Sequence, residues 1–90
     1  MPDAVRVIIS GRVQGVGFRY SAQREARKLG IVGFARNEND GSVYIEAQGE
    51  ETALKTFLAW CHKGPWFAKV NRVKVSEAEA SEVFQIFETR

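Results

Sequence analysis

Apolar residues recur at every second position in three stretches of this chain, residues 5–13, 42–48 and 70–76, and a period of two is typical of a strand that buries one face. A further strand is expected over 31–37, which is the second of the four in chain order. The first strand is expected to end near Arg12, and the Asp40-Gly41 step predicts a hairpin turn between the second and third strands. A short apolar run from Val83 to Phe87 predicts one additional edge strand.

Two other stretches carry apolar residues at helical spacing, which predicts amphipathic helices. The stretch from Phe18 to Leu29 is followed by Gly30, and the stretch over 51–63 is followed by Gly64-Pro65, both of which are typical helix stops. The resulting order is β-α-β-β-α-β. We therefore expect an α+β protein of the ferredoxin-like class, in which an antiparallel sheet carries two helices on one face.

The composition is that of an ordinary globular domain, because 44% of the 90 residues are hydrophobic and 27% are charged. We expect a single domain over 1–90, since this length leaves no room for a second core. No apolar run is long enough to span a bilayer, and the start of the chain lacks the features of a secretion signal. These observations predict a cytoplasmic protein with no membrane partner.

The charge is mildly basic, with 13 basic and 11 acidic residues and a net charge of +2. This balance suits a small anionic ligand. A nucleic-acid binder would usually show a denser basic stripe, so we expect no nucleic-acid partner.

The segment 14–19 is the most informative part of the chain, because it joins a predicted strand to a predicted helix. Gly15 and Gly17 allow a sharp turn, and the start of a helix offers unpaired N–H groups and the positive end of its dipole. Arg19 could reach the same place and hold an oxyanion with two parallel hydrogen bonds. The alternative is an ordinary glycine turn with a solvated arginine. No nucleotide-binding glycine motif is present.

Asn37 ends the second predicted strand, and its amide offers donors and an acceptor that do not titrate. Such a group can orient a water molecule. The alternative is a turn asparagine that satisfies the local backbone. Only the presence of Arg19 favours the first interpretation.

Together these segments resemble the two signatures of the acylphosphatase family. The first is the sequence GRVQGVGFR at 11–19, and the second begins with GFARN at 33–37 and continues to Gly41, Val43 and Gly49. The resemblance extends over nearly the whole chain. Two places depart from the family pattern: Trp66-Phe67 follow Pro65 where a second proline and small residues are common, and the end at 84–90 lacks the usual aromatic-basic strand.

The resemblance implies hydrolysis of small acyl phosphates that needs neither a metal nor an organic cofactor, and we expect a monomer. It implies that Arg19 and the backbone of Gly15, Val16, Gly17 and Phe18 bind the phosphoryl group. Asn37 would hold the attacking water, so no covalent phosphoenzyme is expected. This division of labour is physically sensible, because a phosphoryl group needs positioning and electrostatic stabilisation more than an acid or a base.

The remaining chemically reactive or aromatic residues give weaker indications of function than Arg19 and Asn37 do. Cys61 and His62 are adjacent on a predicted helix and point about 100° apart, which argues against a nucleophile and base pair. We expect Cys61 to be buried and His62 to lie near the negative end of the helix dipole. The aromatic residues Trp66 and Phe67, if exposed, would border a partner or substrate surface. One histidine and one cysteine provide too few ligands for a metal site.

Two other functions remain open. Ferredoxin-like sheets also form RNA-binding modules, but the third strand carries only Tyr44 and lacks their basic-glycine-aromatic signature. Acylphosphatase-like domains also occur at the head of larger maturation proteins, where they handle carbamoyl phosphate. The length of this chain favours the free-standing hydrolase.

Overall fold

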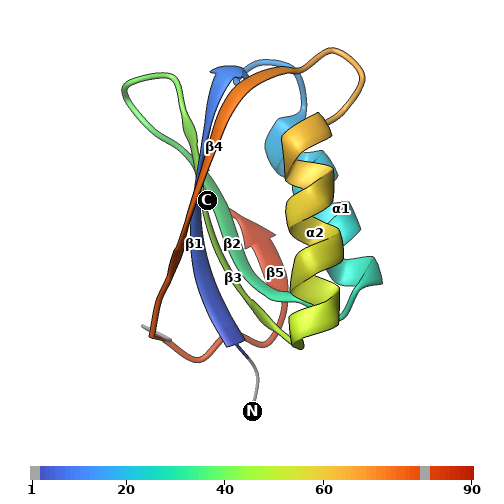
Figure 1. The fold of residues 1–90 in the computed structure, drawn as a ribbon. Coiled ribbons are helices and arrows are strands. Elements are labelled where there is room, and N and C mark those ends of the chain that lie inside the picture. Colours follow the sequence, from blue (N-terminus) through green and yellow to red (C-terminus); the bar gives the residue numbers. More distant parts are fainter. Residues whose placement is uncertain (1–2, 80–81) are drawn as a thin grey trace.

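The computed structural model describes residues 3–79 and 82–90, which form five strands and two helices (Figure 1). In chain order these are β1 (Asp3–Arg12), α1 (Phe18–Lys28), β2 (Val32–Asn37), β3 (Val43–Gly49), α2 (Glu51–Lys63), β4 (Lys69–Glu77) and β5 (Phe87–Thr89). The predicted order β-α-β-β-α-β and the α+β class are confirmed, with a short fifth strand at the end. No helix in the described ranges is long and apolar enough to cross a membrane.

The strands form one sheet in the order β4-β1-β3-β2-β5. The four long strands pair antiparallel, as predicted. The fifth strand corrects the prediction in two ways, because β5 runs parallel to β2 and begins at Phe87, where the predicted run ended. Val83 is 91% exposed whereas Phe87 is fully buried. Only the last residue of that apolar run therefore reaches the core, and the sheet as a whole is mixed.

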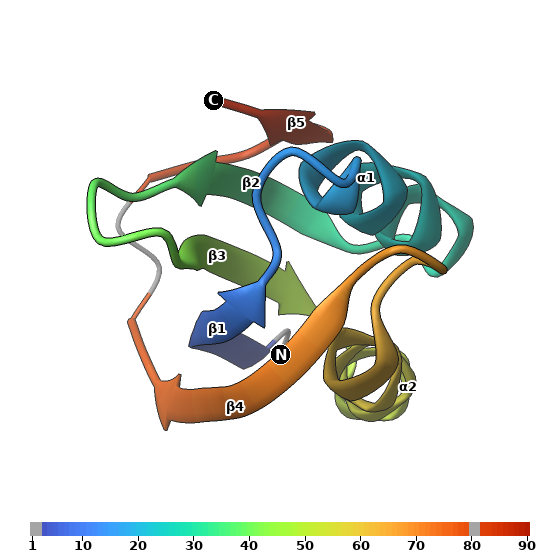
Figure 2. The ribbon, with the colours of Figure 1, turned by 90° about the horizontal axis from the view of Figure 1, so that it is seen from above.

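Both helices cover the same face of the sheet (Figure 2). The alternating strand residues and the helical apolar residues meet in this layer and are almost completely buried, among them Val7, Ile9, Phe18, Ala22, Ala26, Val43, Ile45, Leu54, Phe57 and Cys61. Burial of each large apolar side chain stabilises the fold by roughly 1.5–3 kcal/mol. The helices are therefore held firmly against the sheet.

The sheet topology brings two distant segments to one edge. Strands β1 and β2 both run antiparallel to β3, so they run parallel to each other and end on the same side. Ile9 of β1 and Asn37 of β2 both pair with Val43 of β3. The loop that follows β1 therefore lies two strands from the end of β2, with only β3 between them.

Candidate active site

The loop after β1 turns sharply into α1 at two glycines. Gly15 and Gly17 have φ values of 75° and 76°, in the left-handed region. In the described part of the chain, every residue with a positive φ is a glycine. A Cβ atom at either position would meet nothing within 4 Å. The backbone conformation, rather than crowding, therefore requires glycine here.

The start of α1 is left open by this turn. Gly17 is the N-cap residue and has no side chain, so no side-chain hydrogen bond caps the helix. Within the described part of the chain, none of the turn and loop hydrogen bonds is donated by the backbone N–H groups of residues 15–20. No acidic residue lies in the first turn. These donors and the positive end of the helix dipole favour a bound anion.

Arg19 lies in the first turn of α1, half-buried beside these backbone groups. Its Nη1 donates a hydrogen bond of 2.9 Å to the main-chain oxygen of Arg90, just beyond β5. The backbone N–H of Arg90 donates in turn to the carbonyl oxygen of Ala35 on β2, at 2.8 Å. The end of the chain thus holds the Arg19 guanidinium on one side and leaves its remaining donors for a ligand.

Asn37 ends β2 and has an unusual hydrogen-bonding state. Its side-chain Oδ1 is buried and has no hydrogen-bond partner in the described structure. An unsatisfied buried acceptor costs roughly 1–3 kcal/mol, and such groups in native proteins call for a water or a ligand. Asn37 therefore offers an acceptor that a water molecule can fill.

A cavity of about 230 Å³ joins these groups. Gly15, Gly17, Phe18, Arg19 and Asn37 all line it, so five of the six residues predicted from the sequence meet in one place. The sixth, Val16, is not among the lining residues, and its side chain packs against the hydrophobic core. Val16 can therefore contribute only its backbone.

Gln14 connects the two halves of the site. Its Nε2 donates to the carbonyl oxygens of Glu38 at 2.7 Å and Ser42 at 2.9 Å, the two ends of the hairpin that follows Asn37. Glu38 N–H also donates to the Ser42 carbonyl oxygen, at 2.9 Å. The loop after β1 and the end of β2 are therefore braced against each other by a side chain.

A family model described as Acylphosphatase matches residues 5–89. An acylphosphatase from Bacillus licheniformis is 51% identical over 82 residues, which cover 91% of each protein. The chain belongs to the acylphosphatase family. The family resemblance inferred from the two motifs is thus confirmed.

Solved structures agree with this membership. The crystal structure of an acylphosphatase from Bacillus subtilis superposes with a TM-score of 0.93 at 41% identity, covering 100% of this chain and 99% of that one. A full-length HypF superposes with a TM-score of 0.91 at 30% identity, but the match covers only 12% of that protein. The same fold therefore occurs both as nearly a whole chain and as a small part of a larger one.

Sequence reasoning missed four residues that line the cavity of this acylphosphatase: Val13, Tyr20, Gln23 and Thr89. Gln23 lies four residues after Arg19 on the same helix, and this spacing could have indicated it. Thr89 lies in β5, and nothing in the local sequence connects that strand to the loop after β1. Only the sheet pairing brings it there.

The thiol of Cys61, the single cysteine of the chain, is not accessible to a substrate. Cys61 is fully buried in the core, and desolvation raises the pKa of its thiol to about 12. His62 is exposed in the last turn of α2, as expected. Within residues 3–79 and 82–90 no cluster of three or more potential metal ligands is found.

Proposed function

We propose that this enzyme hydrolyses the carboxyl-phosphate bond of acyl phosphates by direct attack of water on the phosphorus. The observation that carries the proposal is the shared cavity, in which Arg19, the open start of α1 and Asn37 face the same space. Family membership supports acyl phosphate hydrolysis as the overall reaction. The roles of the individual residues are inferred from the geometry.

The phosphoryl group would lie against the start of α1. Backbone N–H groups of residues 15–19 would donate to its oxygens, and the Arg19 guanidinium would add charge-assisted hydrogen bonds. These donors stabilise the negative charge on the equatorial oxygens during transfer. Because they are fixed by the glycine turn and by the contact with Arg90, little reorganisation is needed when the substrate binds.

The attacking water would be held by Asn37. Its buried Oδ1 accepts a hydrogen bond from the water, which leaves an oxygen lone pair directed at the phosphorus. The amide does not take the proton. The water forms the new P–O bond, the bond to the carboxyl oxygen breaks with its electron pair, and a substrate phosphate oxygen accepts the proton. The carboxylate leaves without needing an acid.

The first test is hydrolysis of benzoyl phosphate in the presence of a chelator. We expect turnover by the unaltered enzyme, and a loss of roughly 10²–10³-fold in kcat for Asn37→Ala. For Arg19→Ala we expect a comparable loss in kcat/KM with a raised KM, because this residue contacts the phosphoryl group before and during transfer. Circular dichroism confirms that each variant folds. An active Asn37→Ala enzyme would contradict the role of Asn37 in holding the water, but not the binding of the phosphoryl group by Arg19.

Oxygen isotopes identify the bond that breaks. In ¹⁸O-labelled water, attack on phosphorus places the label in inorganic phosphate, whereas attack on the carbonyl carbon places it in benzoate. Single-turnover mass spectrometry distinguishes the two products. Label in benzoate would overturn the proposed mechanism even if the enzyme is fully active.

Two alternatives are tested with the same protein. Carbamoyl phosphate is offered as a second substrate, and a clear preference for it would favour the function of domains in larger maturation proteins. A folded but inactive protein would instead favour a binding module. Fluorescence anisotropy with labelled single-stranded RNA would then test the RNA-binding interpretation.

A further inference from the structure

The loop between α2 and β4 exposes two large aromatic side chains. Trp66 is 91% exposed and Phe67 is 72% exposed, and their ring centroids lie 5.2 Å apart. Aromatic side chains usually dominate cores and interfaces because they carry a large apolar area. Here Trp66 and Phe67 form a small projecting apolar surface that no part of the described chain covers.

The base of this loop is firmly packed. The N–H of Ala68 donates to the carbonyl oxygen of Pro65 at 3.0 Å, which closes a turn around the two aromatic residues. Gly64 is buried against the ring of Phe18, and a Cβ at this glycine would lie only 2.7 Å from that ring. The loop is therefore attached to the start of α1, and its two rings project from a rigid base.

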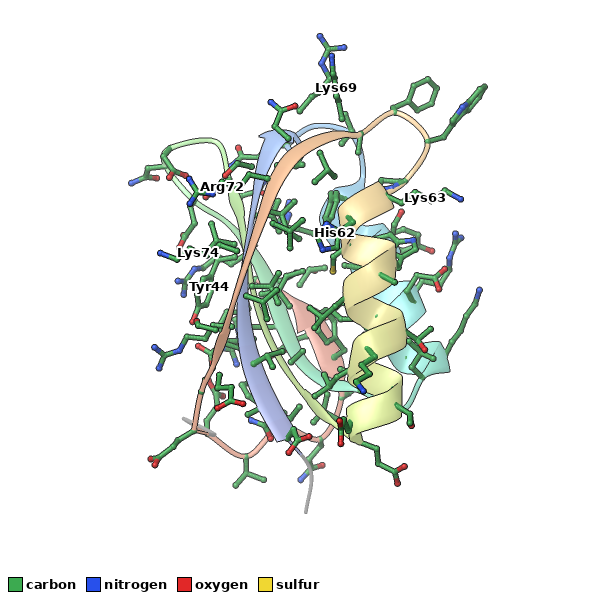
Figure 3. All side chains as sticks on the ribbon, viewed as in Figure 1. Tyr44, His62, Lys63, Lys69, Arg72 and Lys74 are labelled. Carbon is green, nitrogen blue, oxygen red and sulfur yellow. The ribbon has the colours of Figure 1, made fainter. Side chains whose placement is uncertain are left out.

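Lysines flank this loop on both sides along the chain. Lys63 ends α2 just before the loop, and Lys69 begins β4 just after it (Figure 3). Arg12 pairs with Lys69 across the sheet, and Arg72 is exposed further along β4. None of these four cations belongs to an ion pair within residues 3–79 and 82–90. The whole stretch 52–76 contains four lysines and one arginine but no acidic residue.

Acidic residues gather at the other end of the sheet. Asp3, Glu51, Glu77 and Glu79 line a single groove there, with Lys55 as its only basic residue. Strand β1 begins at Asp3 and ends at Arg12, so its ten residues separate the two ends by roughly 30 Å. The separation exceeds the Debye length at physiological salt, about 8 Å. The acidic end would therefore add little repulsion when the aromatic end approaches a negatively charged surface.

We propose that Trp66, Phe67, Lys63 and Lys69, the aromatic tip, dock this protein onto the surface of an anionic lipid bilayer. Tryptophan rings favour the headgroup region, and lysines beside them contact anionic headgroups. The lysines on both sides of the two rings match the anionic headgroups that surround an aromatic ring inserted at the bilayer interface. The expectation of no membrane partner rested on the lack of a spanning segment, which surface docking does not require.

The test measures binding of the full chain to vesicles by sedimentation. Vesicles of phosphatidylcholine with phosphatidylglycerol are compared with vesicles of phosphatidylcholine alone. We expect binding to the anionic vesicles, weakened by salt. The double variant Trp66→Ala/Phe67→Ala should lower the partition coefficient roughly tenfold or more, and Lys63→Gln/Lys69→Gln should lower it roughly ten- to thirtyfold. All four side chains are exposed, so the variants should fold.

Matched controls separate the tip from general charge and apolar exposure. Lys28→Gln/Lys55→Gln removes the same charge from helix positions remote from the tip, where both lysines are ion-paired. Val83→Ala alters an apolar side chain that is as exposed as Trp66. Both controls should bind as the unaltered protein does. A blue shift of tryptophan emission on binding, abolished by Trp66→Ala, would place the indole in the lipid.

Three results would overturn the proposal. The first is a lack of binding to anionic vesicles, and the second is binding that the tip variants do not weaken. The third is self-association that the tip variants abolish, detected by analytical ultracentrifugation without lipid, which would assign the tip to a second copy of this chain. None of these measurements depends on hydrolysis, so their outcome is independent of the proposed catalytic function.

Discussion

The guanidinium of Arg19 is hydrogen-bonded to the main-chain oxygen of Arg90, a residue 71 positions later in the chain, at 2.9 Å. This contact fixes a side chain at the cavity from a segment outside both sequence motifs. The side chain of Arg90 makes different interactions, because it forms ion pairs with Glu82 at 3.0 Å and Glu88 at 2.8 Å. The main chain and the side chain of Arg90 can therefore be tested separately.

Removal of Arg90 should impair catalysis more than stability. Without its main-chain oxygen, Arg19 is free to adopt other rotamers, and we expect kcat/KM to fall roughly ten- to a hundredfold. Arg90→Ala keeps the main-chain contact. It loses the exposed ion pairs and the cation–π contact of the guanidinium with the Phe34 ring, whose centroid lies 4.2 Å away, and such exposed contacts contribute little. We expect Arg90→Ala to retain nearly full activity. Equal losses of activity in the two variants would show that the side chain, rather than the main chain, positions Arg19.

Asn37→Ala should lose activity without losing stability. The native Oδ1 is buried and unsatisfied, so its removal eliminates an unfavourable group, and functional residues of this kind often limit stability. We expect the free energy of urea unfolding to stay equal or rise by about 1 kcal/mol. Asn39→Ala, at an exposed turn position, is the control and should keep its activity. Marked destabilisation by Asn37→Ala would indicate a structural hydrogen bond instead.

Gln14→Ala should loosen the hairpin that follows Asn37. The change removes hydrogen bonds of 2.7 and 2.9 Å and leaves two partly buried carbonyl oxygens without this donor. We expect a loss of roughly 1–3 kcal/mol in unfolding free energy, together with a lower kcat because the asparagine shifts with the hairpin. Gln85→Ala, at an exposed position, is the control. A variant with unchanged stability would show that the brace is not formed in solution.

The hairpin should also weaken in acid. Ser42 donates to Oδ1 of Asp40 from its hydroxyl at 2.6 Å and from its backbone N–H at 2.9 Å. These bonds lower the pKa of Asp40 below its ordinary value, the hydroxyl bond having the larger effect. A lowered folded-state pKa contributes stability above the unfolded-state pKa, and this contribution is lost as pH falls through the folded-state pKa.

We therefore expect the thermal midpoint to decline below about pH 4. The pKa of Glu82 is also lowered, first by its hydrogen bonds from Arg90, and contributes in the same direction. Asp40→Asn should make the acid limb of the stability curve shallower, when midpoints are measured by circular dichroism over a series of pH values. An unchanged limb would mean that Asp40 does not titrate differently in the folded and unfolded states.

Most of the fold was predictable from the sequence, because its elements are specified locally. The alternation at Val7 and Ile9 and the helical spacing of Phe18, Ala22 and Ala26 each follow from a few neighbouring residues that must share one buried face. The fifth strand was predicted in the wrong place. Its position depends on a parallel pairing with β2, and the short run from Val83 to Ile86 carries no signal of that partner.

The candidate site was predictable to a similar extent. The types and order of Gly15, Gly17, Arg19 and Asn37 match an anion cradle and a polar partner, and the cavity brings them together. The role of Gln14 was not predictable. Its side chain acts on carbonyl oxygens 24 and 28 residues away, and a single glutamine in a loop gives no indication of such partners.

The sequence by itself determined which segments form the four long strands and the two helices, where the chain must turn at glycine, and which residues could bind a phosphoryl group. The tertiary structure alone decided that Arg90 holds Arg19, that Oδ1 of Asn37 is buried without a partner, and that Trp66 is exposed. The physical reason is the separation along the sequence over which each interaction acts. Periodicity and backbone conformation depend on neighbours in sequence, whereas hydrogen bonds and burial between distant segments depend on how the sheet and helices pack.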